Sequence, residues 1–229
     1  MDKPWNKLIV ALDLDDKEKI EKVVDVLGPK GVKFKIGSIA FTRFGPEFVR
    51  NFINNKGVEI FLDLKLYDIP NTMAKTASVI TELGVWAFTV HLAAGREALS
   101  AVKTSVSNAA RRHRRNSPLI LGVTVLTSSE LGMQARQEQI KKFADLAQNL
   151  GLDGIISSPL DVKKIKEIYQ DKLKIITPGI RNPQEETQDQ KRVATANQAF
   201  FEGADYIVVG RPIINKTDYL KAAEEIFSF

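Results

Sequence analysis

The sequence predicts an α/β fold in which residues 1–229 form a single (β/α)8 TIM barrel. Short apolar, β-branched runs alternate with longer stretches of helical spacing, eight times in succession. A chain of 229 residues suits one such barrel, which typically takes roughly 250 residues or somewhat fewer. No Pro-, Gly- or Ser-rich linker and no low-complexity tract divides the chain, so we expect one domain.

The strand predictions rest on apolar, β-branched runs, and the helix predictions rest on apolar residues three and four positions apart. The predicted strands are residues 8–12, 32–36, 58–66, 86–91, 119–126, 154–157, 175–177 and 206–209. The predicted helices are residues 17–27, 47–54, 72–83, 97–112, 137–150, 161–169, 194–202 and 218–226. Strands that alternate with helices indicate βαβ units and a parallel sheet.

Glycine and proline mark several of the expected helix ends. A glycine follows five of the predicted helices, at the position where a left-handed backbone favours this residue: Gly28, Gly57, Gly84, Gly151 and Gly203. Pro70 precedes the helix predicted at 72–83, where its missing N–H costs little.

A doubly wound open sheet is the alternative α/β architecture. It predicts a Gly-x-Gly-x-x-Gly turn directly after the first strand. The first strand here runs into Asp13-Leu14-Asp15-Asp16 and contains no glycine, so the sequence favours the closed barrel.

The formal net charge of +5 fits an anionic small-molecule ligand, a nucleic acid or solubility alone. The densest basic run, residues 111–115, lies at the end of a predicted helix, where positive side chains complement the helix dipole. No aromatic residues interleave with this run, as a stacking surface for bases requires. We therefore interpret it as a solvated helix end, and we predict no nucleic-acid partner.

Other compositional features narrow the class of protein. The absence of cysteine excludes disulfides, thiolate metal sites and cysteine nucleophiles. No apolar run is long enough for a membrane span, and residues 1–6 lack the pattern of a signal peptide. We therefore predict a cytoplasmic protein without membrane association.

The two histidines do not indicate a metal site. His91 and His113 have no acidic partner at metal-ligand spacing, so we predict no metal site and expect His91 to be a hydrogen-bonded barrel residue.

The third predicted strand carries charged residues on one face. Side chains alternate along a strand, so Asp63 and Lys65 share a face and the intervening leucines share the other. The leucines suit packing against outer helices, so we expect the charged pair inside the barrel. Asp68 lies just beyond the strand, where a loop can direct it to the same place or to a neighbouring subunit.

The first two predicted strands add charges at the same end of the barrel. Asp13 follows the first strand on the face of Ile9 and Ala11, and Lys35 lies near the end of the second. Buried charges are costly unless they are paired. One interpretation is an ion-pair network that only holds the barrel mouth. We favour a catalytic cluster, because active sites of this fold lie at the C-terminal strand ends.

The last two predicted strands each end in glycine near an arginine: Gly179 with Arg181, and Gly210 with Arg211. Loops after these strands often bind phosphate in this fold, through backbone N–H groups and the guanidinium fork. Either segment alone fits an ordinary turn equally well, but the two together favour a phosphate site. The polar segment 182–191 between them is either a lid, with Gln190 as a contact, or a plain surface loop.

Residues 63–72 read Asp-Leu-Lys-Leu-Tyr-Asp-Ile-Pro-Asn-Thr and match every fixed position of the pattern Asp-x-Lys-x-x-Asp-Ile-Pro-x-Thr. In this motif the chain resembles the orotidine 5′-monophosphate decarboxylase family. Shorter motifs fall in family order along the whole chain: Ala11-Leu12-Asp13, Lys35-Ile36-Gly37, Leu126-Thr127-Ser128, Pro178-Gly179-Ile180-Arg181, Asp189-Gln190 and Gly210-Arg211-Pro212. The resemblance implies cofactor-free conversion of orotidine 5′-monophosphate to uridine 5′-monophosphate and carbon dioxide, a step of pyrimidine biosynthesis.

The resemblance also implies a role for each site residue. Lys65 would protonate C6 of the pyrimidine, Asp63 would lie against the departing carboxylate, and Lys35 and Asp68 would complete the charge array. Asp68 and Thr72 would come from the partner subunit of a homodimer. The remaining implied contacts are to the ribose (Asp13 and Lys35), the pyrimidine (Thr127) and the phosphate (Gln190, Gly210 and Arg211, with Arg181 nearby).

Two other functions remain open at this point. Magnesium-dependent sugar-phosphate decarboxylases and aldolases of the same superfamily share Asp-x-Lys-x-x-Asp but typically continue with Ala-Gly, whereas Ile69-Pro70 follows here. A non-catalytic nucleic-acid-binding protein would bind polyanions with a steep salt dependence, but this function gives no reason for Asp63 and Lys65 to share one strand face.

One position departs from the family pattern. Proline often follows the threonine at position 195 in related sequences, whereas Ala196 follows it here; the change affects a helix start.

Overall fold

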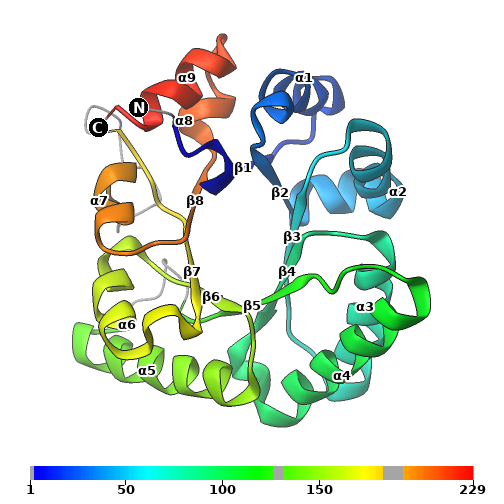
Figure 1. Ribbon diagram of the computed structural model, residues 1–229, viewed down its shortest axis with the longest axis vertical. Coiled ribbons are helices and arrows are strands. Elements are labelled where there is room, and N and C mark those ends of the chain that lie inside the picture. The colour runs from blue at the N-terminus through cyan, green and yellow to red at the C-terminus, as the bar shows by residue number, and fades with distance from the viewer. Residues whose placement is uncertain (1–2, 126–130, 183–192, 229) are drawn as a thin grey trace.

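The protein forms a closed barrel of parallel strands surrounded by helices (Figure 1). The computed structural model describes residues 3–125, 131–182 and 193–228. Within them, the strands follow chain order around the barrel, and β8 closes on β1 through the pairs Leu8–Ile207, Ile9–Val208 and Val10–Val209. The strands are β1 (Leu8–Ala11), β2 (Lys33–Gly37), β3 (Ile60–Leu66), β4 (Ala87–His91), β5 (Leu119–Val123), β6 (Gly154–Ile156), β7 (Lys174–Thr177) and β8 (Tyr206–Val209). The predicted barrel is confirmed.

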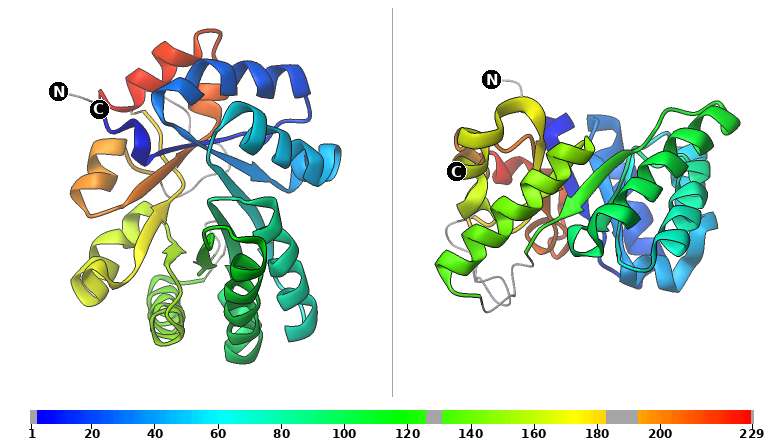
Figure 2. Two further views of the ribbon diagram at one scale, coloured as in Figure 1. Left: turned by 45° about the vertical axis from the view of Figure 1, so that its right-hand side comes forward. Right: turned by 90° about the horizontal axis from the view of Figure 1, so that it is seen from below.

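The helices form a ring around the barrel in the order of the chain, as Figures 1 and 2 show. They are α1 (Lys17–Leu27), α2 (Ser38–Lys56), α3 (Pro70–Leu83), α4 (Gly95–His113), α5 (Met133–Leu150), α6 (Val162–Tyr169), α7 (Ala196–Phe201), α8 (Arg211–Ile214) and α9 (Tyr219–Ile226). Short 3-10 turns lie at Trp5–Lys7, Gly28–Lys30, Leu92–Ala94, Pro159–Asp161 and Gln170–Lys172. None of the helices in the described part of the chain is long and apolar enough to cross a bilayer.

Two apolar layers hold the fold together, and the alternation of side chains along the strands separates them. One layer lies inside the barrel and consists of Ile9, Ala11, Phe61, Ala87, Leu121, Ile176 and Val208. The larger layer lies between the strands and the helices, and it includes the alternate strand residues Val10, Phe34, Leu62 and Phe88. The strands therefore direct every second residue towards the barrel axis, where functional side chains can meet.

Two local predictions need correction, and one short helix was not predicted. Gly28 has a right-handed helical backbone, and the left-handed glycine is Gly31, because a 3-10 turn extends helix α1. Helix α2 begins at Ser38 instead of residue 47, since the chain stays helical on both sides of a kink at Gly45, which has φ 73°. Helix α8 was not predicted, because Gly210 and Arg211 were interpreted as either an ordinary turn or a phosphate contact.

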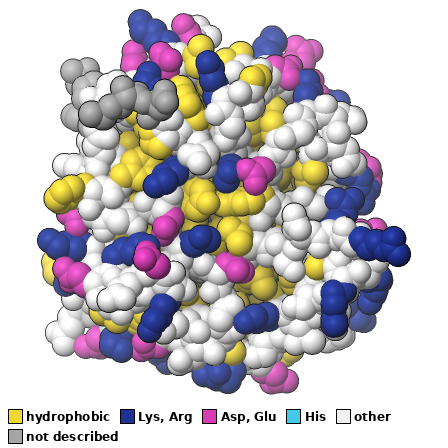
Figure 3. All heavy atoms as spheres, viewed as in Figure 1, with side chains coloured by type: hydrophobic (Ala, Val, Ile, Leu, Met, Phe, Trp, Pro, Cys, Tyr) yellow, Lys and Arg dark blue, Asp and Glu magenta, His cyan; other side chains and the backbone are white. Residues whose placement is uncertain are grey.

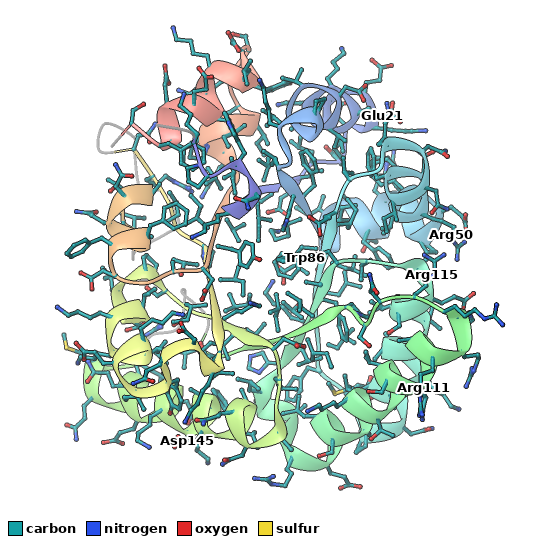
Figure 4. All side chains as sticks on the ribbon, viewed as in Figure 1. Glu21, Arg50, Trp86, Arg111, Arg115 and Asp145 are labelled. Atoms are coloured by element: carbon teal, nitrogen blue, oxygen red, sulfur yellow. The ribbon has the colours of Figure 1, made fainter. Side chains whose placement is uncertain are left out.

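The basic run at residues 111–115 was expected at a solvated helix end. Helix α4 ends at His113, and Arg114 adopts a left-handed backbone just after it. Arg111 and Arg115, labelled in Figure 4, are exposed at the outside of the helical ring. The exposed position at a helix end is confirmed, and the absence of a nucleic-acid partner stays a prediction.

Candidate active site

A cavity of about 500 Å³ lies at the C-terminal ends of the strands. Its described lining includes six charged side chains: Asp13, Lys35, Asp63, Lys65, Arg181 and Arg211. All six were predicted site residues, and Gly210 lines the same cavity. They come from the ends of β1, β2, β3, β7 and β8, where this fold places its chemistry. Residues separated by almost 200 positions in the chain thus share one site.

Four of these side chains form a row of alternating charge. Lys35 Nζ lies 2.8 Å from Asp13 Oδ1 and 3.6 Å from Asp63 Oδ2. Lys65 Nζ lies 2.9 Å from the same oxygen of Asp63. Asp63 and Lys35 are nearly buried, whereas the side chain of Lys65 is 42% exposed. Both ammonium groups face the cavity, and that of Lys65, at the end of the row, is the more exposed.

The row depends on a glycine at the end of β2. A Cβ atom at Gly37 would lie 2.7 Å from Asp13 Oδ1 and 3.2 Å from Lys35 Nζ. No side chain fits there unless the ion pair moves. The Asp13–Lys35 pair thus occupies the space that Gly37 leaves.

Asp63 is the charged centre of the row. Burial alone would raise the pKa of its carboxyl group, but the positive charges of Lys35 and Lys65 lower it. Hydrogen bonds from Lys65 and Thr89 act in the same direction, so the pKa of Asp63 lies below its usual 3.8. The carboxylate is therefore ionised at neutral pH, next to an ammonium that faces the cavity.

Strand β3 is not the regular strand that strict alternation assumed. Leu62 pairs with Phe88 and Leu66 pairs with Val90, so four steps along β3 match two along β4. Lys65 has φ 50°, a left-handed backbone that costs an L-residue roughly 1–2 kcal/mol. The prediction that Asp63 and Lys65 face the same site is confirmed, but the irregular backbone contributes to that geometry.

The last two strand ends form the other side of the cavity. Gly210 caps the short helix α8, and Arg211 is the first residue of that helix. Arg181 is 7% exposed, and its Nη1 donates to the carbonyl oxygen of Ile180 at 2.7 Å. The two arginines therefore line the cavity from adjacent positions, as the sequence predicted.

Four predicted site residues are not part of this described cavity. Asp68 and Thr72 are exposed, and Asp68 Oδ1 accepts a hydrogen bond of 2.7 Å from the N–H of Ile69. Neither residue is among the described residues that line the cavity of this single chain. Thr127 and Gln190 lie outside the described residues.

His91 lies at the end of β4 next to this site. Its Nδ1 accepts a hydrogen bond from the N–H of Ala93 at 3.2 Å, and its ring packs against Tyr67 at 5.4 Å between centroids. Burial, and then the charge of Lys65, hold the pKa of His91 below its usual 6.5. The interpretation of His91 as a hydrogen-bonded barrel residue is confirmed.

Several lining residues were not predicted from the sequence. Apolar side chains from the inward strand faces narrow the cavity, among them Phe61, Val123, Ile156 and Val208. Ser157 and Ser158 line it from the end of β6. The alternation along the strands predicts that these apolar residues face the barrel interior. Nothing in the local sequence shows that they line a cavity and are not ordinary core residues.

A family model described as "Orotidine 5'-phosphate decarboxylase / HUMPS family" matches residues 6–226. The chain belongs to this family. It is 40% identical over 233 residues to the orotidine 5'-phosphate decarboxylase of Coxiella burnetii (strain RSA 493 / Nine Mile phase I), and the match covers 99% of this chain and 97% of that relative. It is 42% identical over 214 residues to the enzyme of the same name from Legionella pneumophila (strain Paris), covering 90% of this chain and 91% of the relative.

Solved structures agree with the sequence relatives. The crystal structure of orotidine 5'-phosphate decarboxylase from Lactobacillus acidophilus matches with a TM-score of 0.81 and 36% identity, covering 96% of this chain and 97% of that one. The enzyme from Pyrococcus horikoshii OT3 matches with a TM-score of 0.78 and 26% identity, covering 96% of this chain and 97% of that one. The family likeness therefore spans the whole barrel.

Proposed function

We propose that this protein decarboxylates orotidine 5′-monophosphate to uridine 5′-monophosphate and carbon dioxide, without a metal or an organic cofactor. The row Asp13–Lys35–Asp63–Lys65, which ends in a cavity-facing ammonium, carries this proposal. Loss of carbon dioxide at C6 leaves negative charge on a carbon with no attached electron sink. An ammonium fixed beside that carbon stabilises the charge as it develops and then donates the proton. We assign this role to Lys65.

The charge of the cavity suits such a substrate. Four basic and two acidic side chains among its described lining residues leave an excess of two positive charges. A phosphate monoester carries about −1.5 to −2 near neutral pH, and orotate adds a carboxylate. The proposed pose places the phosphate at Gly210 and Arg211 and the carboxylate near Asp63, with the ribose between them at Asp13 and Lys35.

The binding roles of the other predicted residues belong to the same proposal. Arg181 would support the phosphate from the base of the loop after β7. Gln190 would contact the phosphate, and Thr127 would contact the pyrimidine. Binding energy at the phosphate lies far from the reacting carbon, but it can still lower the barrier through orientation.

We also propose that the protein works as a homodimer in the cytoplasm. Asp68 lies between Tyr67 and Ile69, and the two apolar side chains are each 65% exposed on the single chain. A partner subunit would cover them and would bring Asp68 and Thr72 to the cavity of the other chain. Closed two-fold dimers are the commonest assemblies of soluble proteins.

The proposed reaction is tested with purified protein, orotidine 5′-monophosphate and a chelator, by following the ultraviolet absorbance change as the carboxylate is lost. We expect the same turnover with and without the chelator. Turnover that the chelator abolishes would favour the magnesium-dependent rival. No turnover in protein shown to be folded by circular dichroism would contradict the proposal.

The dimer is tested by mixing two inactive variants, Lys65→Ala and Asp68→Ala. If Asp68 acts across the interface, each mixed dimer contains one intact site, and random exchange restores about a quarter of the wild-type sites. Activity no higher than the sum of the separate variants would show that both residues act in one chain.

A further inference from the structure

The irregular part of β3 lies opposite one threonine of β4. Thr89 stands between Phe88 and Val90, the two residues that pair with Leu62 and Leu66 on either side of the irregularity. Its neighbours belong to the outer apolar layer, so Thr89 faces the barrel interior. The side chain is completely buried.

The hydroxyl group of Thr89 makes two hydrogen bonds to this part of β3. Its Oγ1 accepts the backbone N–H of Lys65 at 2.8 Å and donates to Asp63 Oδ1 at 3.0 Å. The other carboxylate oxygen, Asp63 Oδ2, accepts the Lys65 ammonium at 2.9 Å. These bonds close a ring that runs from the backbone of Lys65 through Thr89 and Asp63 to Nζ of the same lysine.

In this ring, Thr89 provides the hydrogen-bond acceptor that the backbone N–H of Lys65 would otherwise find on a neighbouring strand. In a regular parallel pair, the N–H of Lys65 would bond to a carbonyl group of the neighbouring strand. Here a side-chain hydroxyl accepts it, at a residue whose left-handed backbone is unfavourable for lysine. Such strain persists only where the surroundings over-determine the conformation.

We infer that Thr89 is a positioning residue that fixes Lys65 and Asp63 in their reactive arrangement. The inference rests on the proposed decarboxylation. Thr89 is not among the described residues that line the cavity, so it acts on the substrate only through these two partners. Without the hydroxyl, the N–H of Lys65 and one oxygen of Asp63 lose a partner, and a regular backbone competes with the strained one.

The test compares Thr89→Ser with Thr89→Ala, because the two variants differ only in the hydroxyl group. We expect Thr89→Ala to lower kcat for orotidine 5′-monophosphate roughly 10- to 100-fold, the scale of a small misplacement of reacting groups. KM should stay within about twofold, since binding contacts are intact. Thr89→Ser should keep kcat within about threefold of wild type.

Thr81 offers a matched control in α3. It is also completely buried, and its hydroxyl donates to the carbonyl oxygen of Ala77 at 2.8 Å, away from the cavity. Thr81→Ala should lower thermal stability and leave kcat unchanged. If Thr89→Ala does not fold, Thr89→Val keeps the volume and takes its place in the comparison.

The outcomes separate this inference from the function on which it rests. A wild-type kcat in folded Thr89→Ala would overturn the inference, and so would equal losses in Thr89→Ser and Thr89→Ala, which would point to packing. A rise in KM alone would also overturn it. If the wild-type protein does not turn over orotidine 5′-monophosphate, the proposed function fails first, and the role of Thr89 fails with it.

Discussion

Strand β2 carries two buried lysines with different surroundings. Lys33 and Lys35 are 6% and 8% exposed, and the strand period places them on the same, inward face. Lys35 lies at the C-terminal end of the barrel between two carboxylates, beside the cavity. Lys33 lies at the other end, where its ammonium contacts Glu59 and lies 5.0 Å from the ring centroid of Trp86.

The N-terminal end of the barrel is closed by aromatic rings. Trp86 packs against Tyr206 at 5.0 Å between centroids and is labelled near the centre of the barrel in Figure 4. Figure 3 shows hydrophobic side chains gathered near the centre of the same face, with charged side chains around them. Aromatic faces and one carboxylate suffice to hold a cation that does no chemistry. Burial of a lysine therefore does not indicate function; its end of the barrel and its partners do.

The largest expected effect concerns Lys65, at the C-terminal end of the barrel, where the cavity lies. Lys65→Ala should lower kcat at least about 1,000-fold, because it removes both the proposed proton donor and a positive charge in the cavity. Its side chain is partly exposed, so the fold should remain intact. The ultraviolet assay and circular dichroism check the two parts, and a substantial residual rate in folded protein would contradict the role of Lys65.

The next effect concerns Lys35. Lys35→Met keeps most of the side-chain volume and removes the charge between Asp13 and Asp63. We expect kcat/KM for orotidine 5′-monophosphate to fall roughly 100-fold or more, because the two carboxylates then repel each other and the row loses its order. Steady-state kinetics measure the change. A loss below about threefold would mean that the row depends on Lys65 and Asp63 alone.

The same lysine-to-methionine change at Lys33, at the N-terminal end of the barrel, should lower stability and leave activity nearly unchanged. Lys33→Met removes the cation–π contact with Trp86, but Glu59 is 52% exposed in its side chain and keeps its hydration. We expect a loss of about 1 kcal/mol in unfolding free energy, equivalent to about 2–4 °C in Tm for a chain of this size. kcat/KM should stay within about twofold of wild type. A large loss of activity would contradict the separation of the two ends.

The sequence predicted much of this arrangement, because the barrel repeats simple local rules. Period-two alternation placed Asp63 and Lys65 on one face, and the strand-end position singled out Lys35. Glycine followed by arginine singled out Gly210 and Arg211, which line the cavity; their binding of phosphate stays a prediction. The placement of these residues at the cavity could be predicted because it depends mainly on where each strand ends.

What the sequence did not show depends on contacts between strands. The left-handed backbone of Lys65 has no local signal, since lysine is not a residue that favours it. The role of Thr89 follows from its register with β3, which one strand alone does not reveal. Lys33 and Lys35 look alike in sequence, because their aromatic and acidic partners lie on or next to the ends of other strands.

The smallest expected effect is a difference in how the two ends respond to pH. Asp63 has a lowered pKa, so its contribution to stability is present above its usual 3.8 and is lost as pH falls through the lower folded value. Burial, and then the charges of Glu59 and Asp205, raise the pKa of Tyr206 above its usual 10.0. The contribution of Tyr206 is therefore present below that pH and is lost as pH rises through the higher folded value.

Urea unfolding as a function of pH measures both contributions. Asp63→Asn should reduce the loss of unfolding free energy below about pH 4 and leave the alkaline side unchanged. Tyr206→Phe should reduce the loss above about pH 10 and leave the acid side unchanged. If either variant altered both limbs of the profile, the ends of the barrel would be energetically coupled. In that case the aromatic closure around Lys33 would contribute to the electrostatics of the cavity as well as to the stability of the barrel.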